Sequence, residues 1–341
     1  MKKVAENKCF SATLCFPREI AFSLQLVKGA CYNTGEPWLP WHDYDRWGDG
    51  MLSSYCTYCL IKRQMEIIKD YGDEDKKSKY MKDVLKAVYE ADEDATAPVI
   101  IAELNELHQS YFGSPYSFDD LKKQYNAMLL QKEDEIAEKI NASQDKLLAA
   151  VKYARVGNYI DFGAMGSVDD EKLNALISSA IAEEIDMLEY RNFQQDLKSA
   201  RHLAYLTDNC GEIVLDKLLI QTIAQEFPTL KITVIVRGMP VLNDATMEDA
   251  EMVGLADLVK VLPNGTKIAG THLASITEEA RDVIDNADLM ISKGQGNFET
   301  LHGCGLNVYY MFLCKCDWFV TRFRLEQFKG VFVNEKNNRI K

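Results

Sequence analysis

The sequence is poor in the features that mark fibrous, disordered and membrane-spanning chains. Its 341 residues include only 19 glycines and 8 prolines, too few for a fibrous or low-complexity chain. No apolar run reaches the roughly 18 residues that a membrane-spanning helix requires. With 47% hydrophobic residues, the chain is too apolar for intrinsic disorder. These absences leave a globular protein with no membrane segment, long enough for two domains.

Positive charge is also scarce, because 39 lysines and arginines face 52 acidic residues, for a net charge of −13. A nucleic-acid binder needs a basic face to neutralise phosphates, so we expect no nucleic-acid partner, and we also expect no membrane partner. Nine cysteines, an odd number in a long chain without a convincing signal peptide, indicate free thiols in a reducing compartment. We therefore expect a cytoplasmic protein. The sequence carries no signal for an oligomeric state.

The composition divides the chain into three predicted parts. Residues 1–50 contain three of the four tryptophans and show no sustained period, so we interpret them as an irregular extension. Residues 51–195 have apolar residues at helical spacings with charges between them, which predicts a mainly helical domain. In residues 196–341, short β-branched runs alternate with helical stretches, and the predicted strands are 203–206, 231–236, 257–262 and 287–292. Their continuous hydrophobicity predicts an α/β class with a Rossmann-like, doubly wound, mainly parallel sheet.

Polar residues follow each of these four predicted strands. In a doubly wound sheet, ligands bind beyond the carboxyl ends of the strands. Aspartates and asparagines offer the oxygen ligands that Mg²⁺ or Mn²⁺ prefers, while Lys293 and nearby glycine N–H groups suit a phosphate. Each segment alone is also consistent with a helix cap or a turn. Their occurrence at consecutive strand ends favours one site for a cation and an anion.

Six ordered motifs lie in and before this region: CTYC at 56–59, GNYIDFG at 157–163, DNCGE at 208–212, RGMPVLND at 237–244, NGT at 264–266 and SKGQGNFE at 292–299. Together they resemble the damage-control phosphatases, a family of metal-dependent phosphatases long catalogued only as a domain of unknown function. The first motif looks like the prokaryotic branch of that family. The resemblance spans about residues 51–335 and does not cover 1–50.

The resemblance implies a helical portion on a Rossmann-like α/β/α domain and one divalent metal ion, Mn²⁺, Co²⁺, Ni²⁺ or Mg²⁺. The family's metal ligands match Asp208, Asn209 and Asp244. Asp208 and Lys293 match its catalytic positions, and it is left open whether Asp208 attacks phosphorus or only holds the metal. Positions expected on the substrate side, or supporting it, are Asn158, Asp161, Glu212, Lys293, Gly294, Asn297 and Glu299.

The leading functional interpretation is a metal-dependent phosphatase that hydrolyses small phosphorylated metabolites. The resemblance implies sugar phosphates or phosphopantetheine-like compounds as substrates. One alternative is a carboxyl methyltransferase that uses S-adenosylmethionine, although its expected glycine-rich loop after the first strand is missing. Another is a sensor that binds a phosphorylated metabolite without turnover. Cys56 and Cys59 fit half a zinc site or a redox pair, but we favour two buried thiols on one helix.

Overall fold

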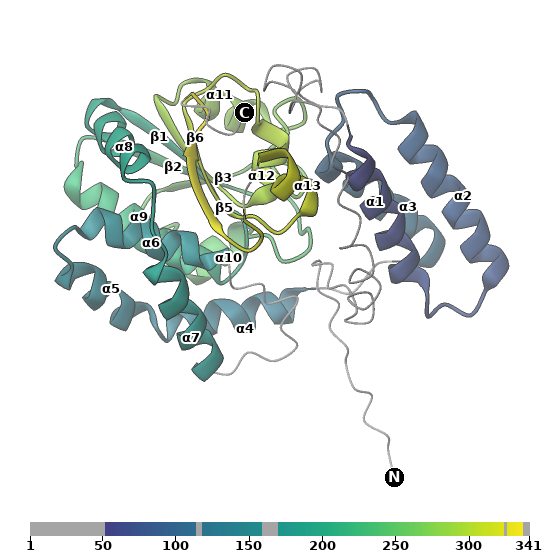
Figure 1. Cartoon of the computed structure of the whole chain (residues 1–341), viewed down its shortest axis with the longest axis horizontal. Coiled ribbons are helices and arrows are strands. Elements are labelled where there is room, and N and C mark those ends of the chain that lie inside the picture. The colour runs from purple at the N-terminus through teal and green to yellow at the C-terminus, as the bar shows by residue number, and fades with distance from the viewer. Residues whose placement is uncertain (1–51, 114–117, 159–169, 324–325, 337–341) are drawn as a thin grey trace, which may run out of the picture. The chain divides into compact units, whose positions relative to one another are not determined.

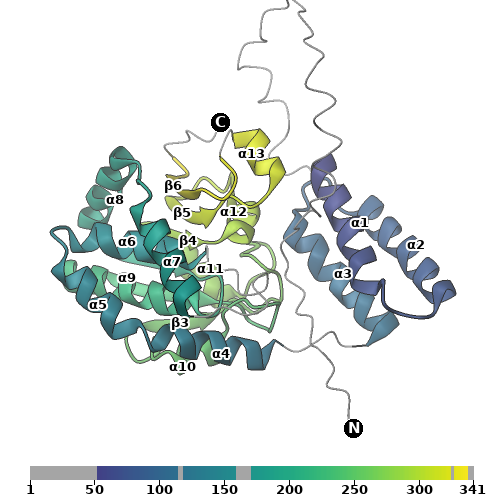
Figure 2. The same ribbon diagram turned by 60° about the horizontal axis from the view of Figure 1, so that its bottom comes forward.

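The computed structural model describes residues 52–113, 118–158, 170–323 and 326–336. The predicted extension and the candidate Asp161 lie outside these described residues. The elements, drawn in Figures 1 and 2, are α1 (Ser54–Ile68), α2 (Glu74–Glu90), α3 (Ala97–Phe112), α4 (Asp119–Leu130), α5 (Glu133–Ala142), α6 (Lys146–Gly157), α7 (Asp170–Ala182), α8 (Met187–Ser199), β1 (His202–Leu206), α9 (Glu212–Glu226), β2 (Lys231–Val236), α10 (Met247–Met252), β3 (Lys260–Pro263), α11 (Glu278–Asp285), β4 (Leu289–Lys293), α12 (Gln295–Leu301), β5 (Val308–Leu313), α13 (Asp317–Phe323) and β6 (Gly330–Asn334).

One sheet of six strands organises the second half of the chain. The strand order is β3-β2-β1-β4-β5-β6, and every neighbouring pair is parallel except β5 with β6. From β1 the chain builds β2 and β3 on one side, and then β4 and β5 on the other. The winding direction therefore reverses between β1 and β4, and such a switch point opens a crevice at the carboxyl ends of the two strands. The predicted doubly wound, mainly parallel sheet is confirmed.

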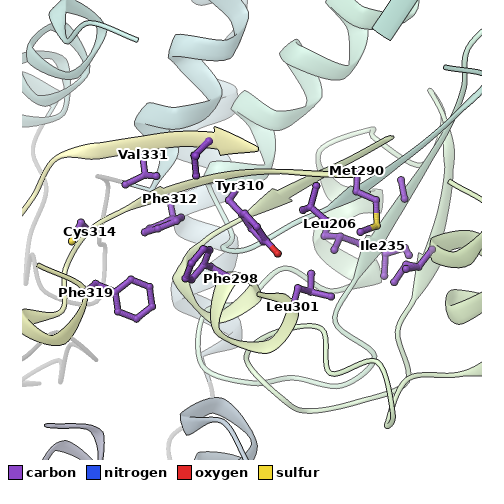
Figure 3. Packing of buried hydrophobic residues seen from close by; sticks show 14 of the residues in the cluster. Leu206, Ile235, Met290, Phe298, Leu301, Tyr310, Phe312, Cys314, Phe319 and Val331 are labelled. Carbon is purple, nitrogen blue, oxygen red and sulfur yellow. The ribbon is translucent and has the colours of Figure 1, made fainter. Parts of the chain in front are cut away.

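Helices cover both faces of this sheet, which explains why every residue of β4 and β5 is buried. On the face shown in Figure 3, the strands pack against α11, α12 and α13 through Leu206, Ile235, Met290, Phe298, Leu301, Tyr310, Phe312, Phe319 and their neighbours. On the other face, the ring of Phe193 in α8 lies 5.0 Å from that of Tyr309 in β5. The hydroxyl of Tyr205 in β1 donates to Asp216 of α9 at 2.7 Å. The strand ends are therefore held on a rigid, two-sided core.

Helices α1, α2 and α3 share a separate apolar core, and they lie side by side in both views (Figures 1 and 2). Gln64 of α1 is fully buried there and accepts a hydrogen bond from the Tyr80 hydroxyl. Cys56 and Cys59 lie on one helix, α1, as predicted, but their free thiols are half-buried rather than buried. Helices α4, α5 and α6 instead contact α9. The domain boundary at residue 195 stays a prediction.

Three strands differ from the sequence-based prediction in position and two were not predicted. β1 begins at His202, one residue earlier than predicted. β3 begins at Lys260 rather than at 257, because residues 256–258 form a turn. β4 begins two residues later than predicted. β5 was missed because its uniformly apolar run of six residues fits a buried helix as well as a strand, and β6 was missed because its apolar run, 331–333, is only three residues long. Among the described helices, none is both long and apolar enough to cross a bilayer.

Candidate functional site

Asp208 and Asp244 come from different strand ends and lie against the same guanidinium. Asp208 follows β1, and Asp244 lies in the loop after β2. The Nε of Arg237 donates to Oδ2 of Asp244 at 2.6 Å, and its Nη2 lies 3.7 Å from Oδ1 of Asp208. Arg237 is only 1% exposed, so water screens these contacts little. The structure thus brings the two carboxylates together beside the switch point of the sheet.

Backbone hydrogen bonds fix the two loops that carry these carboxylates. Asn209 and Asp244 form an isolated antiparallel bridge. The N–H of Cys210 donates to the carbonyl of Asn243 at 2.8 Å, and the N–H of Ala245 donates to the carbonyl of Asp208 at 2.8 Å. These main-chain hydrogen bonds therefore set the relative position of the backbone at the three predicted metal ligands, whichever rotamers their side chains adopt.

Two amides orient the Asp208 carboxylate. The Nδ2 atoms of Asn158 and Asn209 donate to its Oδ2 at 2.8 Å and 2.7 Å. Asn158 is 2% exposed, and its own Oδ1 accepts from the N–H of Leu313 at the end of β5. Gly294 lies against the same carboxylate, because a Cβ on it would be 2.1 Å from Cγ of Asp208. With φ at +81°, only glycine fits this position without strain.

Lys293 lies at the end of β4 and is completely buried. Its ammonium donates to Glu212 at 2.6 Å, to Asp216 at 2.6 Å and to the carbonyl of Ala154 at 2.8 Å. A lysine has three N–H donors, so all of them are directed at protein acceptors. A direct contact with phosphate would require one of these bonds to be replaced. That role of Lys293 stays a prediction.

Asn297 joins strand ends rather than facing a ligand. Its Nδ2 donates to the carbonyls of Thr207 and Lys293 at 3.0 Å and 2.7 Å. Its Oδ1 accepts from Arg237 Nη1 at 3.2 Å and from the hydroxyl of Thr271 at 2.8 Å. The side chain is fully buried, with every hydrogen-bonding position used. It connects the ends of β1 and β4 to the arginine that pairs the two aspartates.

Glu212 and Glu299 lie in different surroundings, although both were predicted on the substrate side. Glu212 is fully buried at the start of α9, and its Oε2 accepts from Asn158 and Asn209, each at 3.2 Å. Glu299 is half-buried on α12 and accepts from Gln295 at 2.7 Å. Burial raises the pKa of Glu299 to about 7. Glu212 therefore belongs to the Asp208 cluster, whereas Glu299 lies one turn along α12 from Gln295.

Sequence reasoning missed Lys315, which follows the carboxyl end of β5. Its charge lowers the pKa of Asp208, so the ammonium lies within electrostatic range of that carboxylate. The backbone N–H of Lys315 donates to Gln295, the residue after Gly294, at 3.4 Å. The rule that candidates follow strand ends would have found this lysine, but β5 itself was not predicted.

Negative charge exceeds positive charge in the buried cluster. Four carboxylates (Asp208, Glu212, Asp216 and Asp244) face two paired cations, Arg237 and Lys293, which leaves two negative charges when all four are ionised. Burial raises the pKa of Asp208 to about 8; the carboxylates of Glu212 and Asp244 add to the shift, and Arg237 opposes it. A divalent cation would compensate the excess.

Three oxygens in the cluster are available to such a cation. Within the described residues, no hydrogen-bond donor reaches Oδ1 of Asp208, Oδ1 of Asn209 or Oδ1 of Asp244. Two carboxylates and one amide suit a hard cation that prefers oxygen ligands. No group of three or more His, Cys, Asp or Glu side chains in the described ranges is arranged to hold a metal, so the amide of Asn209 is essential to this assignment.

Comparisons with known proteins show which family and which solved structures this chain resembles. A profile of the damage-control phosphatase ARMT1-like domain matches residues 52–330. A damage-control phosphatase of Pyrococcus horikoshii is 32% identical over 189 residues, which cover 55% of this chain and 64% of that protein. A damage-control phosphatase of Archaeoglobus fulgidus is 27% identical over 275 residues, covering 78% and 93%. The crystal structure of a DUF89 family protein from Pyrococcus horikoshii matches with a TM-score of 0.72 at 27% identity, covering 83% of this chain and 98% of that one.

The raised pKa of Asp208 predicts how the stability of the metal-free protein depends on pH. Its pKa in the folded protein, about 8, exceeds the unfolded value of ~3.9. The protonated carboxyl therefore stabilises the fold, and this contribution is fully present below about pH 4. This contribution is lost as the pH rises to about 8. We expect Asp208→Asn to gain stability relative to wild type over that range, measured by urea unfolding in the presence of a chelator. Asp282→Asn, which changes an exposed carboxylate on α11, should follow the wild-type curve. Identical pH profiles for Asp208→Asn and wild type would contradict the prediction.

Proposed function

Because the chain belongs to the damage-control phosphatase ARMT1-like family, we propose that it is a metal-dependent phosphatase that hydrolyses small phosphorylated metabolites. One observation carries the proposal. Two carboxylates from different strand ends contact one buried guanidinium, and three oxygens around them accept no hydrogen bond from the described residues. This cluster lies at the switch point between β1 and β4, where doubly wound folds bind ligands.

We assign Asp208, Asn209 and Asp244 as the ligands of one divalent cation. When bound, such a cation supplies a positive charge that polarises a phosphoryl oxygen and lowers the pKa of a bound water. Burial raises the pKa of Asp244, and the guanidinium of Arg237 opposes this shift. Arg237 thereby helps to keep Asp244 in the ionised form that a metal ligand requires.

Neighbouring residues orient the acidic groups. Asn158 and Asn209 hold Oδ2 of Asp208, so its Oδ1 is the atom left to contact the cation or the phosphoryl group. Burial raises the pKa of Asp216 to about 6, and the ammonium of Lys293 opposes the shift. We propose that Lys293 keeps Asp216 ionised and holds the side chains of Glu212 and Asp216 in position. Glu212 in turn accepts from the same two asparagines.

We propose that Lys315 neutralises the phosphoryl oxygens of the substrate. It follows β5, which neighbours β4 in the sheet, so its backbone lies at the same edge as Gly294. Its charge acts on Asp208, and it is half-buried rather than enclosed as Lys293 is. An ammonium within electrostatic range of the acidic cluster suits the charge of a phosphate group.

The direct test is the release of p-nitrophenol from p-nitrophenyl phosphate by the full chain. After treatment with EDTA we expect no turnover, and we expect Mn²⁺, Co²⁺, Ni²⁺ or Mg²⁺ to restore it. Asp244→Ala should lower kcat by roughly 10²–10³, the usual effect of removing one preorganised charge partner. The exposed Asp282→Ala serves as a control and should retain full activity. Turnover that survives EDTA would contradict metal dependence, and binding of phosphate esters without turnover would favour a sensor.

Lys315→Met tests the proposed phosphate contact. Loss of the ammonium should lower kcat/KM for phosphate esters by about 10², because the charge on the phosphoryl group is no longer neutralised. Lys329→Met removes an exposed lysine near the start of β6 and should leave kcat/KM unchanged. If Lys315→Met retains wild-type kcat/KM, the phosphate contact belongs to another cation, and Lys293 becomes the candidate.

Gly294→Ala tests the close approach of the chain to Asp208. Both this variant and Gly305→Ala place a side chain at positive φ (+81° and +73°), with a similar backbone cost of roughly 1–2 kcal/mol. Only at Gly294 would the new Cβ overlap the Asp208 carboxylate, because no atom lies within 4 Å at Gly305. We expect metal-dependent activity to fall at least tenfold in Gly294→Ala and to persist in Gly305→Ala. Equal activities of Gly294→Ala and Gly305→Ala would contradict the prediction, because displacement of the Asp208 carboxylate would then not affect turnover.

A further inference from the structure

Helix α4 carries two polar residues on its buried face. Lys122 is 5% exposed and Asn126 is fully buried, although both lie where an amphipathic helix normally presents apolar side chains. Burying an ammonium and an amide costs free energy unless both are paired. Their partners lie more than eighty residues further along the chain. Figures 1 and 2 show α4 beside α10, which follows the loop that carries Asp244.

The first partner is Asp249, in the first turn of α10. The Lys122 ammonium lies 2.6 Å from its Oδ2, and Nδ2 of Asn126 donates to its Oδ1 at 2.8 Å. Asp249 also accepts from the N–H and the hydroxyl of Thr246, at 2.8 Å and 2.9 Å, which caps α10. Thr246 is two residues after Asp244. The network therefore fixes the start of α10 and with it the end of the Asp244 loop.

The second partner is Gly211, in the other ligand loop. Oδ1 of Asn126 accepts from the backbone N–H of Gly211 at 2.6 Å. Gly211 precedes α9 with φ at +70° and is two residues after Asn209. The Asn126 amide is therefore bonded to both ligand loops. It accepts from Gly211 in the loop of Asp208 and Asn209, and it donates to Asp249, which fixes the end of the Asp244 loop. The loops also bond directly to each other, so Asn126 completes a closed set of contacts around the Asn209–Asp244 bridge.

We propose that Asn126, supported by Lys122, is a positioning residue for the cation site. It holds the loops of Asp208–Asn209 and Asp244 at the separation that one divalent ion requires. This inference rests on the proposed function, because it assumes that these three residues bind a cation. Loss of a hydrogen-bond partner behind a metal ligand typically weakens metal affinity roughly 10- to 100-fold. We expect a loss of that size when Asn126 is replaced by an apolar residue of similar volume.

The test is calorimetric titration of the EDTA-treated full chain with Mn²⁺. We expect Asn126→Leu to bind Mn²⁺ at least tenfold more weakly than wild type. Gln64→Leu is the matched control: Gln64 is also a fully buried amide on a helix, but its partner is Tyr80 in the core of α1–α3. It should lose stability and keep wild-type affinity for Mn²⁺. Equal affinities of Asn126→Leu and wild type would overturn the inference while leaving the proposed function intact.

A second variant covers the case in which Asn126→Leu does not fold. Lys122→Met keeps the bonds from Asn126 to Gly211 and Asp249 and removes only the ammonium beside Asp249. We expect Lys122→Met, like Asn126→Leu, to bind Mn²⁺ more weakly than wild type. Unchanged affinity would overturn the inference. Failure of the wild-type chain itself to bind any of the four divalent ions would overturn the proposed function and this inference together.

Discussion

A single buried guanidinium is the positive charge that both candidate carboxylate ligands contact. Arg237 contacts Asp244 and Asp208 and donates to Asn297, so three strand ends converge on one side chain. A buried arginine without carboxylate partners would cost several kcal/mol, which makes this convergence a requirement of folding rather than a choice of rotamer. Its Nη2 makes no hydrogen bond with the described residues. Arg237 therefore holds Asp244 by a hydrogen bond and Asp208 by charge, and no donor of the described residues makes a hydrogen bond to the Oδ1 atom of either carboxylate.

The acidic cluster works against the stability of the fold that holds it. Burial and mutual repulsion raise the pKa of Asp208, Asp216 and Asp244, so the ionised cluster is unfavourable without a compensating cation. The sheet offsets this cost with strands buried on both faces and rings packed around Phe298. Groups that destabilise a protein in this way commonly gather where it binds a ligand.

Much of the fold and part of the site could be predicted from the sequence, for identifiable reasons. Continuous apolar runs gave the parallel sheet, and the strand-end rule found Asp208, Asp244 and Gly294, which the structure brings together. Lys315 escaped because the strand before it was not predicted. Asn126 escaped because a polar residue on an amphipathic helix is normally solvated, and only a tertiary contact 85 residues away reveals otherwise. The enclosure of Lys293 depends likewise on α9, whose Glu212 and Asp216 lie one turn apart.

The contacts that build the site join very distant parts of the chain. Asn126 bonds to Asp249 across 123 residues, Lys293 to Ala154 across 139, and Asn158 to Leu313 across 155. During synthesis, β1 and the two acidic residues that follow it, Asp208 and Glu212, would emerge long before β4 and β5 exist to complete their surroundings. Long-range closures of this kind form late and slowly in folding. The loops that carry the acidic residues therefore form before their surroundings do. The candidate cation site is complete only when β5, the last parallel strand, has joined the sheet.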